Sequence, residues 1–185
     1  MNHKAKTDNL PLVVDLDGTL INIDLLYTGF ISLIKKNLLF IVISPFWLFN
    51  GRAYFKRKIF EIIDIKPELL PYNSDLLHFL IEQHKNGRKL ILATASPIKV
   101  AMKISRHQKI FNEVYGTEGN TNLKGNKKLE LLNSNYGERN FDYIGNSNDD
   151  LIIFASARYS YLVNPKKSLE RKTREVSDLK FIFYH

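Results

Sequence analysis

Hydrophobic residues recur along the chain with two different spacings, which separate predicted strands from predicted helices. Short, nearly continuous apolar runs predict buried strands at residues 12–16, 88–94, 113–115, 141–144 and 159–163. Apolar residues three and four positions apart predict helices over 74–87, 96–109 and 124–132, with a further helix from about residue 149. From residue 74 onward strands and helices alternate, which favours a parallel sheet covered on both faces.

Two of the predicted helices have recognisable residues at their ends. Ser74 precedes apolar residues at helical spacing and Gly87 follows them, which is typical of an N-cap and of a C-terminal glycine. For the helix over 96–109 we expect Ser96 as the N-cap and Pro97 as the first helical residue. These end signals support the alternation of strands and helices.

The segment 22–72 interrupts this alternation directly after the first predicted strand. Its pattern is mostly helical and strongly apolar. We therefore expect an α/β fold with a Rossmann-like parallel sheet formed by residues 1–21 and 73–185. Residues 22–72 are expected to form a small helical cap inserted after the first strand.

Two apolar runs within this segment, LLYTGFISLI (25–34) and LLFIVISPFWLF (38–49), allow two interpretations. Each is shorter than the about 20 residues that a membrane-spanning helix needs, and Pro45 is expected to break or kink the second. In one interpretation the cap buries its aromatic residues against the core. In the other, which is compatible with the first, an apolar surface lies on a membrane or against a membrane partner. Basic residues that suit anionic lipid flank the runs: Lys35, Lys36, Arg52, Lys56, Arg57 and Lys58.

Composition narrows the class of protein. A chain of 185 residues, with 44% hydrophobic and 25% charged residues, has the composition of about one globular domain. The absence of cysteine excludes disulfides, thiolate catalysis and cysteine-based zinc sites. The formal net charge of +8 favours anionic partners. Much of this charge lies at 166–174, which we expect to be a solvated tail.

Other classes are disfavoured by missing motifs. Neither zinc-finger spacing nor a helix-turn-helix accompanies the positive charge, so we do not expect a nucleic acid partner. The start of the chain, MNHKAKTDN, is polar and lacks the apolar core of a signal peptide. We expect a cytoplasmic protein, peripheral on the cytoplasmic face of a membrane if the apolar runs meet lipid.

Polar residues follow the predicted strands at the edge of the sheet where ligands bind in open α/β folds. Asp15 and Asp17 end the first strand, Thr94 ends the second and Ser96 follows it. The remaining two groups are Lys124, which follows a Gly-rich loop, and the sequence GNSNDD at 145–150. We therefore expect carboxylates, hydroxyls and a lysine to converge on one cleft.

This combination of side chains suits phosphoryl transfer through an aspartyl-phosphate. Like charges such as Asp15 and Asp17 are costly to bury unless a positive group accompanies them. Mg²⁺ prefers carboxylate and carbonyl oxygens and also binds phosphate. One aspartate can then attack phosphorus, and the second can protonate the leaving oxygen and later deprotonate water. A lysine and a hydroxyl would stabilise the equatorial oxygens.

The sequence DLDGT, Thr94, Lys124 and GNSNDD together resemble the four ordered motifs of the haloacid dehalogenase (HAD) superfamily, whose members are mostly phosphatases. The resemblance implies that Asp15 is the nucleophile and Asp17 the general acid and base. It implies a Mg²⁺ site of Asp15, Asp17, Asn146 and Asp150, with Asp17 contributing its backbone carbonyl. It also implies phosphate binding by Thr94, Ala95, Ser96 and Lys124.

Two details of the resemblance leave alternatives open. Lys127 and Lys128 compete with Lys124 for the phosphate-binding role, and the position of the Lys-Gly pair favours Lys124. Many superfamily members have aspartate where this chain has Asn146, so we expect weaker Mg²⁺ binding than in a fully acidic site. Asp149 either supplies the missing charge or caps the helix that follows.

A narrower resemblance extends over nearly the whole chain, through the segments PLVVDLDGTLI, PFWLFNGRAYFKRKI, LILATASP and FDYIGNS. These segments are similar to the HAD domain that is fused to, or encoded beside, UbiA-type polyprenyl transferases. The resemblance implies a phosphatase acting on a phosphorylated small molecule or on a lipid-linked substrate of the polyprenyl-phosphoribose type. The alternative is a non-catalytic HAD-like module that recruits or regulates a membrane prenyltransferase.

Overall fold

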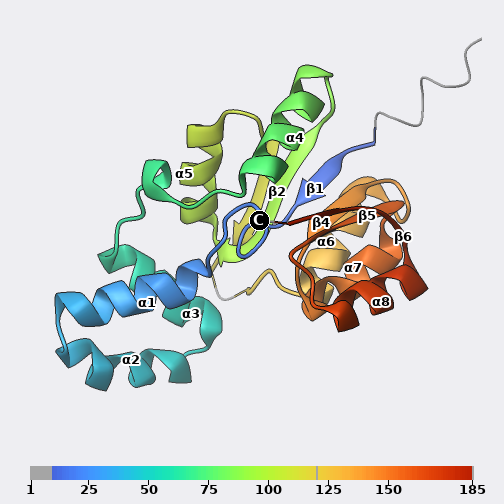
Figure 1. The fold of residues 1–185 in the computed structure, drawn as a ribbon. Helices are drawn as coiled ribbons and strands as arrows, with labels where there is room; N and C mark the ends of the chain where they lie inside the picture. The colour runs from blue at the N-terminus through green and yellow to red at the C-terminus, as the bar shows by residue number, and fades with distance from the viewer. Residues whose placement is uncertain (1–9, 120, 185) are drawn as a thin grey trace, which may run out of the picture.

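The computed structural model describes residues 10–119 and 121–184, which form a six-stranded parallel sheet with helices on both faces (Figure 1). The strand order is β3-β2-β1-β4-β5-β6, and every neighbouring pair is parallel. The strands are β1 (Leu12–Val14), β2 (Leu90–Pro97), β3 (Glu113–Thr117), β4 (Asp142–Gly145), β5 (Tyr159–Val163) and β6 (Asp178–Phe183). The predicted Rossmann-like arrangement is confirmed.

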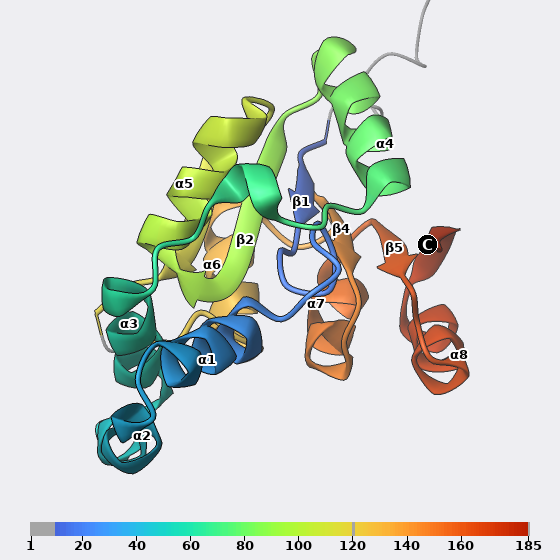
Figure 2. The ribbon, with the colours of Figure 1, turned by 60° about the vertical axis from the view of Figure 1, so that its left-hand side comes forward.

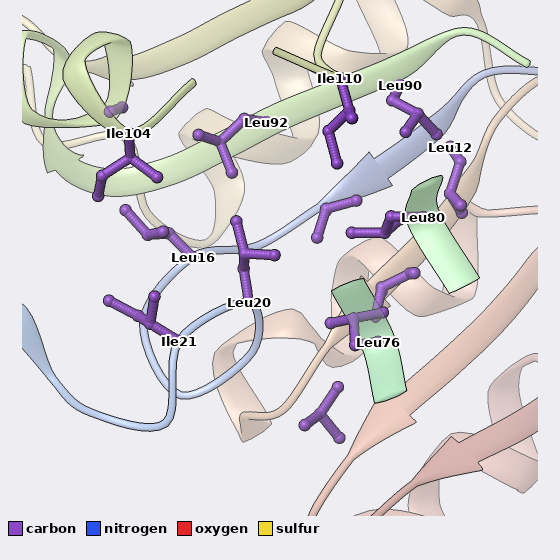
Figure 3. Packing of buried hydrophobic residues seen from close by; sticks show 14 of the residues in the cluster. Leu12, Leu16, Leu20, Ile21, Leu76, Leu80, Leu90, Leu92, Ile104 and Ile110 are labelled. Carbon is purple, nitrogen blue, oxygen red and sulfur yellow. The ribbon is translucent and has the colours of Figure 1, made fainter. Parts of the chain in front are cut away.

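Two groups of helices bury the two faces of the sheet. On one face lie α4 (Ser74–Lys85) and α5 (Ile98–Gln108), and on the other α6 (Asn126–Tyr136), α7 (Leu151–Ser156) and α8 (Lys167–Val176). Successive residues of β1 point to opposite faces, so Val14 belongs to the α4–α5 core and Val13 to the other. Figure 3 shows Leu76 and Leu80 of α4 near the strands in the first of these cores.

A separate helical segment connects β1 to α4. It contains α1 (Leu25–Lys36), α2 (Leu39–Phe49), α3 (Arg52–Ile62) and the short 3₁₀ helix η1 (Pro67–Leu69). In both ribbon views α1 and α3 lie between the sheet and α2, which is the outermost element (Figure 2). Pro45 lies inside α2 and does not end it. This segment is placed beside the loop that follows β1, where the predicted active-site residues begin.

The basic run at 166–174 is not a solvated tail, and that prediction was wrong. Most of it forms α8, in which Leu169 and Thr173 are buried one turn apart while the charged residues lie on the opposite face. The run then leads into β6, which adds an edge strand to the sheet beside β5. The many charged residues of this run made its amphipathic pattern hard to recognise. That pattern consists of the two buried residues, which are four positions apart.

Both serines expected to cap helices have other positions. Asn73 is the N-cap of α4, and its side chain accepts a hydrogen bond from the Leu76 amide. The helix α5 begins at Ile98, later than expected, because β2 continues to Pro97. Ser96 therefore lies at the end of a strand, where its hydroxyl is available for the site described below.

Candidate active site

A cavity of about 640 Å³ lies beyond the carboxyl ends of β1, β2 and β4, against α1 and α3. Seven of the eight predicted site residues line this cavity: Asp15, Asp17, Ala95, Ser96, Lys124, Asn146 and Asp150. The eighth, Thr94, is buried behind them. The structure thus brings together residues that are up to 135 positions apart in the sequence, between Asp15 and Asp150, as expected for strand ends that meet at one edge of a parallel sheet.

The centre of the cavity holds two carboxylates around one lysine. Lys128 donates a hydrogen bond to Asp15 Oδ1 at 2.7 Å, and its Nζ lies 3.9 Å from Asp150 Oδ1. Tyr143 donates to Asp150 Oδ1 at 2.8 Å. Burial alone would lower the pKa of Lys128, but Asp15 and Asp150 outweigh it and raise that pKa, so the lysine stays charged.

Asp15 remains electrostatically unfavourable as an anion despite this lysine. Burial raises the pKa of Asp15 to about 6, with Asp150 and Asp17 raising it and Lys128 lowering it. A raised pKa means that these surroundings stabilise the carboxylate anion less well than water does. A further positive group at this place would therefore stabilise Asp15.

Lys124, which the sequence favoured as the phosphate-binding lysine, lies at the rim of the cavity. Its Nζ forms an exposed ion pair with Asp149 Oδ2 at 2.8 Å. The helix α6 begins only after Gly125, so the residue of its first turn that faces the sheet is Lys128, one turn before the buried Leu132. The structure therefore places Lys128, the alternative left open by the sequence, in contact with Asp15 in place of Lys124.

The carboxylate of Asp17 is held by three donors on the side of the cavity nearest α1. It accepts hydrogen bonds from the Leu25 amide at 2.8 Å, from Ser96 Oγ at 2.7 Å and from Thr94 Oγ1 at 3.3 Å. Thr94 Oγ1 in turn accepts from the Ser96 amide at 2.9 Å. Burial raises the pKa of Asp17, and the bonds from Leu25 and Ser96 offset part of this. Asp15 and Asp17 thus have different surroundings although they are only two residues apart.

The turn after β1 requires glycine at position 18. Gly18 has φ +71°, and a Cβ at this position would lie 2.1 Å from Nδ2 of Asn146. The Asn146 side chain is therefore packed directly against the turn that carries Asp15 and Asp17. Asp150 is fixed beside it, because its Oδ2 accepts from the Ser147 hydroxyl at 2.8 Å and the Ser147 amide at 3.1 Å.

These oxygen atoms fit a hard cation. Within residues 10–119 and 121–184 no cluster of three His, Cys, Asp or Glu side chains has metal-binding geometry. The predicted ligand set, however, includes an amide and a backbone carbonyl as well as carboxylates, all of them oxygen donors of the kind that Mg²⁺ prefers. The raised pKa of Asp15 is independent support, since it shows a buried carboxylate that is not fully compensated.

Sequence reasoning missed the contribution of α3 to this cavity. Arg52 and Lys56 line it, although both had been interpreted only as basic residues beside the apolar runs. The available signal was the spacing of Ala53, Lys56 and Ile59, which are the buried residues of α3. A lysine at that spacing lies on the buried face of the helix and therefore points toward the body of the protein.

Solved structures with the same architecture share this arrangement of elements. Phosphoserine phosphatase in its apo form matches with a TM-score of 0.65 and 14% identity, over 94% of this chain and 93% of that one. A phospho-aspartyl intermediate analogue of phosphoserine phosphatase matches with a TM-score of 0.61 and 14% identity, over 94% and 93% of the two chains. A haloacid dehalogenase-like hydrolase from Streptococcus pneumoniae gives 0.60 and 14%, over 97% and 95%. The chain has the HAD fold.

Sequence comparison finds one relative of this chain. The uncharacterised protein y4nM of Sinorhizobium fredii is 34% identical over 167 residues, which are 90% of this chain and 32% of that protein. The chain therefore spans about a third of the length of this relative. No protein-family model matches the sequence. The HAD fold is thus established by the structure, and the chemistry must be argued from the cavity.

Proposed function

We propose that this chain is a Mg²⁺-dependent phosphatase that hydrolyses a phosphomonoester through an aspartyl-phosphate on Asp15. The observation that carries the proposal is the grouping of Asp15 and Asp150 around Lys128 in one cavity, with Asp17 held by other donors beside them. The similarity in fold to phosphoserine phosphatase, including a phospho-aspartyl intermediate analogue, is in line with this chemistry.

The two aspartates have surroundings that suit different roles. Asp15 would attack phosphorus, forming a bond between its carboxylate oxygen and phosphorus while the bond to the leaving oxygen breaks. Asp17 would give its proton to that leaving oxygen, and its burial raises its pKa as a proton donor requires. In the second step a water molecule attacks phosphorus, Asp17 takes a proton from it, and Asp15 is released with inorganic phosphate.

Other residues of the cavity would bind the phosphoryl group, orient Asp17 and contact the rest of the substrate. Lys128 holds a fixed positive charge 2.7 Å from Asp15 Oδ1, where the equatorial oxygens of the phosphoryl group would gather. Ser96 and Thr94 would orient Asp17 through their hydroxyl groups. Lys124, at the rim, would meet the outer part of the substrate.

Mg²⁺, when bound, would neutralise the carboxylates and polarise the phosphoryl group. The residues that would hold it are Asp15, Asn146 and Asp150, together with the backbone carbonyl of Asp17. Asn146 supplies an oxygen ligand without a negative charge, and Lys128 already neutralises part of the site. We therefore expect only modest affinity for the metal.

Replacing Asn146 with Asp is expected to tighten Mg²⁺ binding about tenfold, because an added carboxylate strengthens the attraction for a divalent ion. Isothermal titration calorimetry with MgCl₂ would measure the change. The matched control is Asn148→Asp, which adds the same charge at an exposed residue that does not line the cavity. An affinity that is unchanged or lower in Asn146→Asp would show that Asn146 is not a ligand.

The direct test of the proposed reaction is Mg²⁺-dependent release of phosphate from an aryl phosphate. We expect release by the unaltered chain and none above background by Asp15→Asn. Equal rates from the two proteins would remove the enzymatic proposal and favour the non-catalytic module.

We further propose that residues 22–72 act as a cap over this cavity and bring it to a membrane surface. Leu26, Leu48 and Phe55 form an apolar part of the cavity wall. Around Leu48, α2 and its N-cap residue carry a group of exposed apolar side chains: Leu38, Leu39, Ile41, Val42, Phe46, Leu48 and Phe49. Of the aromatic residues of α2, Phe46 and Phe49 are exposed, whereas Phe40 and Trp47 are half-buried and contact each other.

An anionic lipid surface is the occupant that this α2 face fits. Large exposed apolar patches mark interaction sites, and Lys35 and Lys36 end α1 directly before α2. Basic residues beside such a patch add attraction to anionic headgroups. No helix within the described part of the chain is long and apolar enough to cross a bilayer, so the contact proposed is peripheral. The continuity between this face and the cavity wall supports a lipid-linked phosphomonoester as substrate.

The double substitution Phe46→Ser and Phe49→Ser is expected to weaken vesicle binding at least tenfold, because each ring contributes about 1 kcal/mol or more when it enters the interface. Flotation with phosphatidylglycerol-containing vesicles, compared with neutral phosphatidylcholine vesicles, would measure this. The control is Phe181→Ser on β6, another exposed phenylalanine at a different place in the fold. Failure of the unaltered protein to float would contradict the membrane proposal. In that case co-purification with a prenyltransferase would test the alternative partner.

A further inference from the structure

The cavity contains a buried lysine that the phosphatase chemistry does not use. Lys56 reaches from α3 and donates to the Ala95 carbonyl at 2.7 Å and to Asn122 Oδ1 at 3.3 Å. Both acceptors are neutral, and no ion pair involves Lys56 within the described part of the chain. Burial lowers the pKa of this ammonium group, and Asp17 offsets part of that effect. An ammonium group held in this way is unfavourable unless an anion joins it.

Arg52 lies one helical turn before Lys56 and lines the same cavity. Residues four apart on a helix lie on one face, so the two cations are neighbours. The other two cations of the cavity are already paired, Lys124 with Asp149 and Lys128 with Asp15. Among the described residues, Arg52 has no such ion pair. The α3 side of the cavity therefore has an excess of positive charge.

The acidic groups nearest this pair have other partners. Asp24 is the N-cap of α1 and accepts from the Tyr27 amide at 3.0 Å. Asp17 accepts from Leu25 and Ser96. Neither forms an ion pair with Arg52 or Lys56 within residues 10–119 and 121–184. The excess charge thus lies beside Asp17, on the side where the leaving group of the substrate would stand.

We propose that Arg52 and Lys56 form a subsite for a second anionic group on the substrate. The substrate would be a phosphomonoester whose leaving group carries a phosphate or carboxylate a few bonds from the scissile ester. A guanidinium beside an ammonium is well suited to such a group, because arginine offers paired donors to planar or tetrahedral oxyanions. This inference rests on the proposed phosphatase, since that reaction defines where the leaving group lies.

A purely structural role for Lys56 makes a different prediction. Its bond to the Ala95 carbonyl joins α3 to β2, and Thr117 donates to the same carbonyl at 2.7 Å. If holding α3 in place were the only role of Lys56, its loss would weaken every ligand equally. That explanation also leaves Arg52 without a role. The two accounts are separated by ligands that differ only in a distal charge.

The experiment measures binding to the Asp15→Asn protein in the presence of Mg²⁺, so that no ligand is consumed. The probes are 1,3-propanediol bisphosphate, the phosphate ester of 3-hydroxypropionate, which has a terminal carboxylate, and propyl phosphate as the neutral-ended control. Calorimetry is expected to show that the two ligands with a second anionic group bind at least tenfold tighter than propyl phosphate. Comparable affinity for all three ligands would overturn the subsite.

Substitution assigns the preference to its residues. The preference is the ratio of the affinity for a ligand with a second anionic group to the affinity for propyl phosphate. Arg52→Gln and Lys56→Gln are each expected to reduce this ratio at least fivefold. Arg57→Gln and Lys58→Gln are matched controls, because they remove the same charges from the same helix outside this cavity and should keep the ratio. A ratio that survives in Arg52→Gln and Lys56→Gln would also contradict the proposal.

Failure of this inference is distinguishable from failure of the proposed reaction. Phosphate release by the Asp15-containing protein tests the reaction, whereas the affinity ratio in Asp15→Asn tests the subsite without turnover. A protein that hydrolyses aryl phosphate but binds all three probes equally would keep the phosphatase and lose the subsite. A ratio that depends on Arg52 and Lys56 without any hydrolysis would keep an anion-binding site and lose the enzyme.

Discussion

The Asp15→Asn protein is expected to lose Mg²⁺-dependent phosphatase activity, with kcat lower by about a thousandfold or more. Asparagine has nearly the same shape as aspartate but cannot supply the anionic oxygen that attacks phosphorus. The substitution also removes the charge that burial disfavours, as the raised pKa of Asp15 indicates. We therefore expect a folded protein, and steady-state release of 4-nitrophenol from its phosphate ester would measure the loss.

The control for Asp15→Asn is Asp64→Asn, the same change at an exposed carboxylate that pairs with Lys103 on the surface. Exposed ion pairs of this kind contribute little to stability, so Asp64→Asn should keep the activity of the unaltered protein. Circular dichroism would confirm that both variants are folded. Activity retained by a folded Asp15→Asn protein would exclude Asp15 as the nucleophile.

Replacing Lys128 with Met is expected to lower kcat at least a hundredfold, whereas Lys124→Met lowers it less than about fivefold. Lys128 is the cation in contact with Asp15 and close to Asp150, while Lys124 forms an exposed ion pair with Asp149. Without Lys128 the two buried carboxylates would face each other, which raises the pKa of Asp15 further and favours its protonated, non-nucleophilic form. Parallel kinetic measurements on the two variants decide between the lysines.

Loss of Lys128 also removes a buried partner, at a cost of about 3–5 kcal/mol in the free energy of unfolding. A second variant keeps the test informative if Lys128→Met does not fold. Lys128→Arg keeps the charge but not the compact shape of the ammonium group, so it should fold and still lose much of kcat. Equal losses from Lys124→Met and Lys128→Arg would contradict the assignment of the phosphate-binding role to Lys128.

The parts of the fold that the sequence predicted are those with a simple local pattern. Buried strands such as β1 appear as continuous apolar runs, and the carboxyl ends of such strands necessarily meet at one edge of a parallel sheet. For that reason Asp15, Ser96 and Asp150 could be placed in one cavity before the structure was known. The prediction needed only the parallel direction of the strands, which the alternation of strands and helices indicates, and the polar residues that follow them.

The sequence was ambiguous where a local signal had two possible causes. The choice between Lys124 and Lys128 depended on where α6 begins, and helix ends are poorly determined by periodicity alone. The charges at 166–174 concealed the buried Leu169 and Thr173, so an amphipathic helix was interpreted as a tail. In each case the interpretation of the sequence depended on which one or two residues of a helical turn face the body of the protein.

The position of Lys56 in the cavity could be recognised only from the tertiary structure. Its neighbours in sequence are basic, and basic residues beside apolar runs are typical of a membrane surface. Only packing shows that Lys56 reaches the Ala95 carbonyl, 39 residues away in the chain, while Lys58 pairs with Glu61 at the surface. The spacing of Ala53, Lys56 and Ile59 indicates that Lys56 lies on the buried face of α3, but neither segment alone indicates that its partner is the end of β2.

The most direct test of the account is to detect a phosphoryl group on Asp15. In Asp17→Asn, 4-nitrophenyl phosphate should still phosphorylate the enzyme, because nitrophenolate leaves without a proton, whereas hydrolysis should be slow for want of a base. After acid quench, peptide mass spectrometry is expected to locate a hydroxylamine-labile phosphate on Asp15. Turnover of this substrate with phosphate on another residue, or with none on Asp15 in the quenched Asp17→Asn enzyme, would contradict the mechanism.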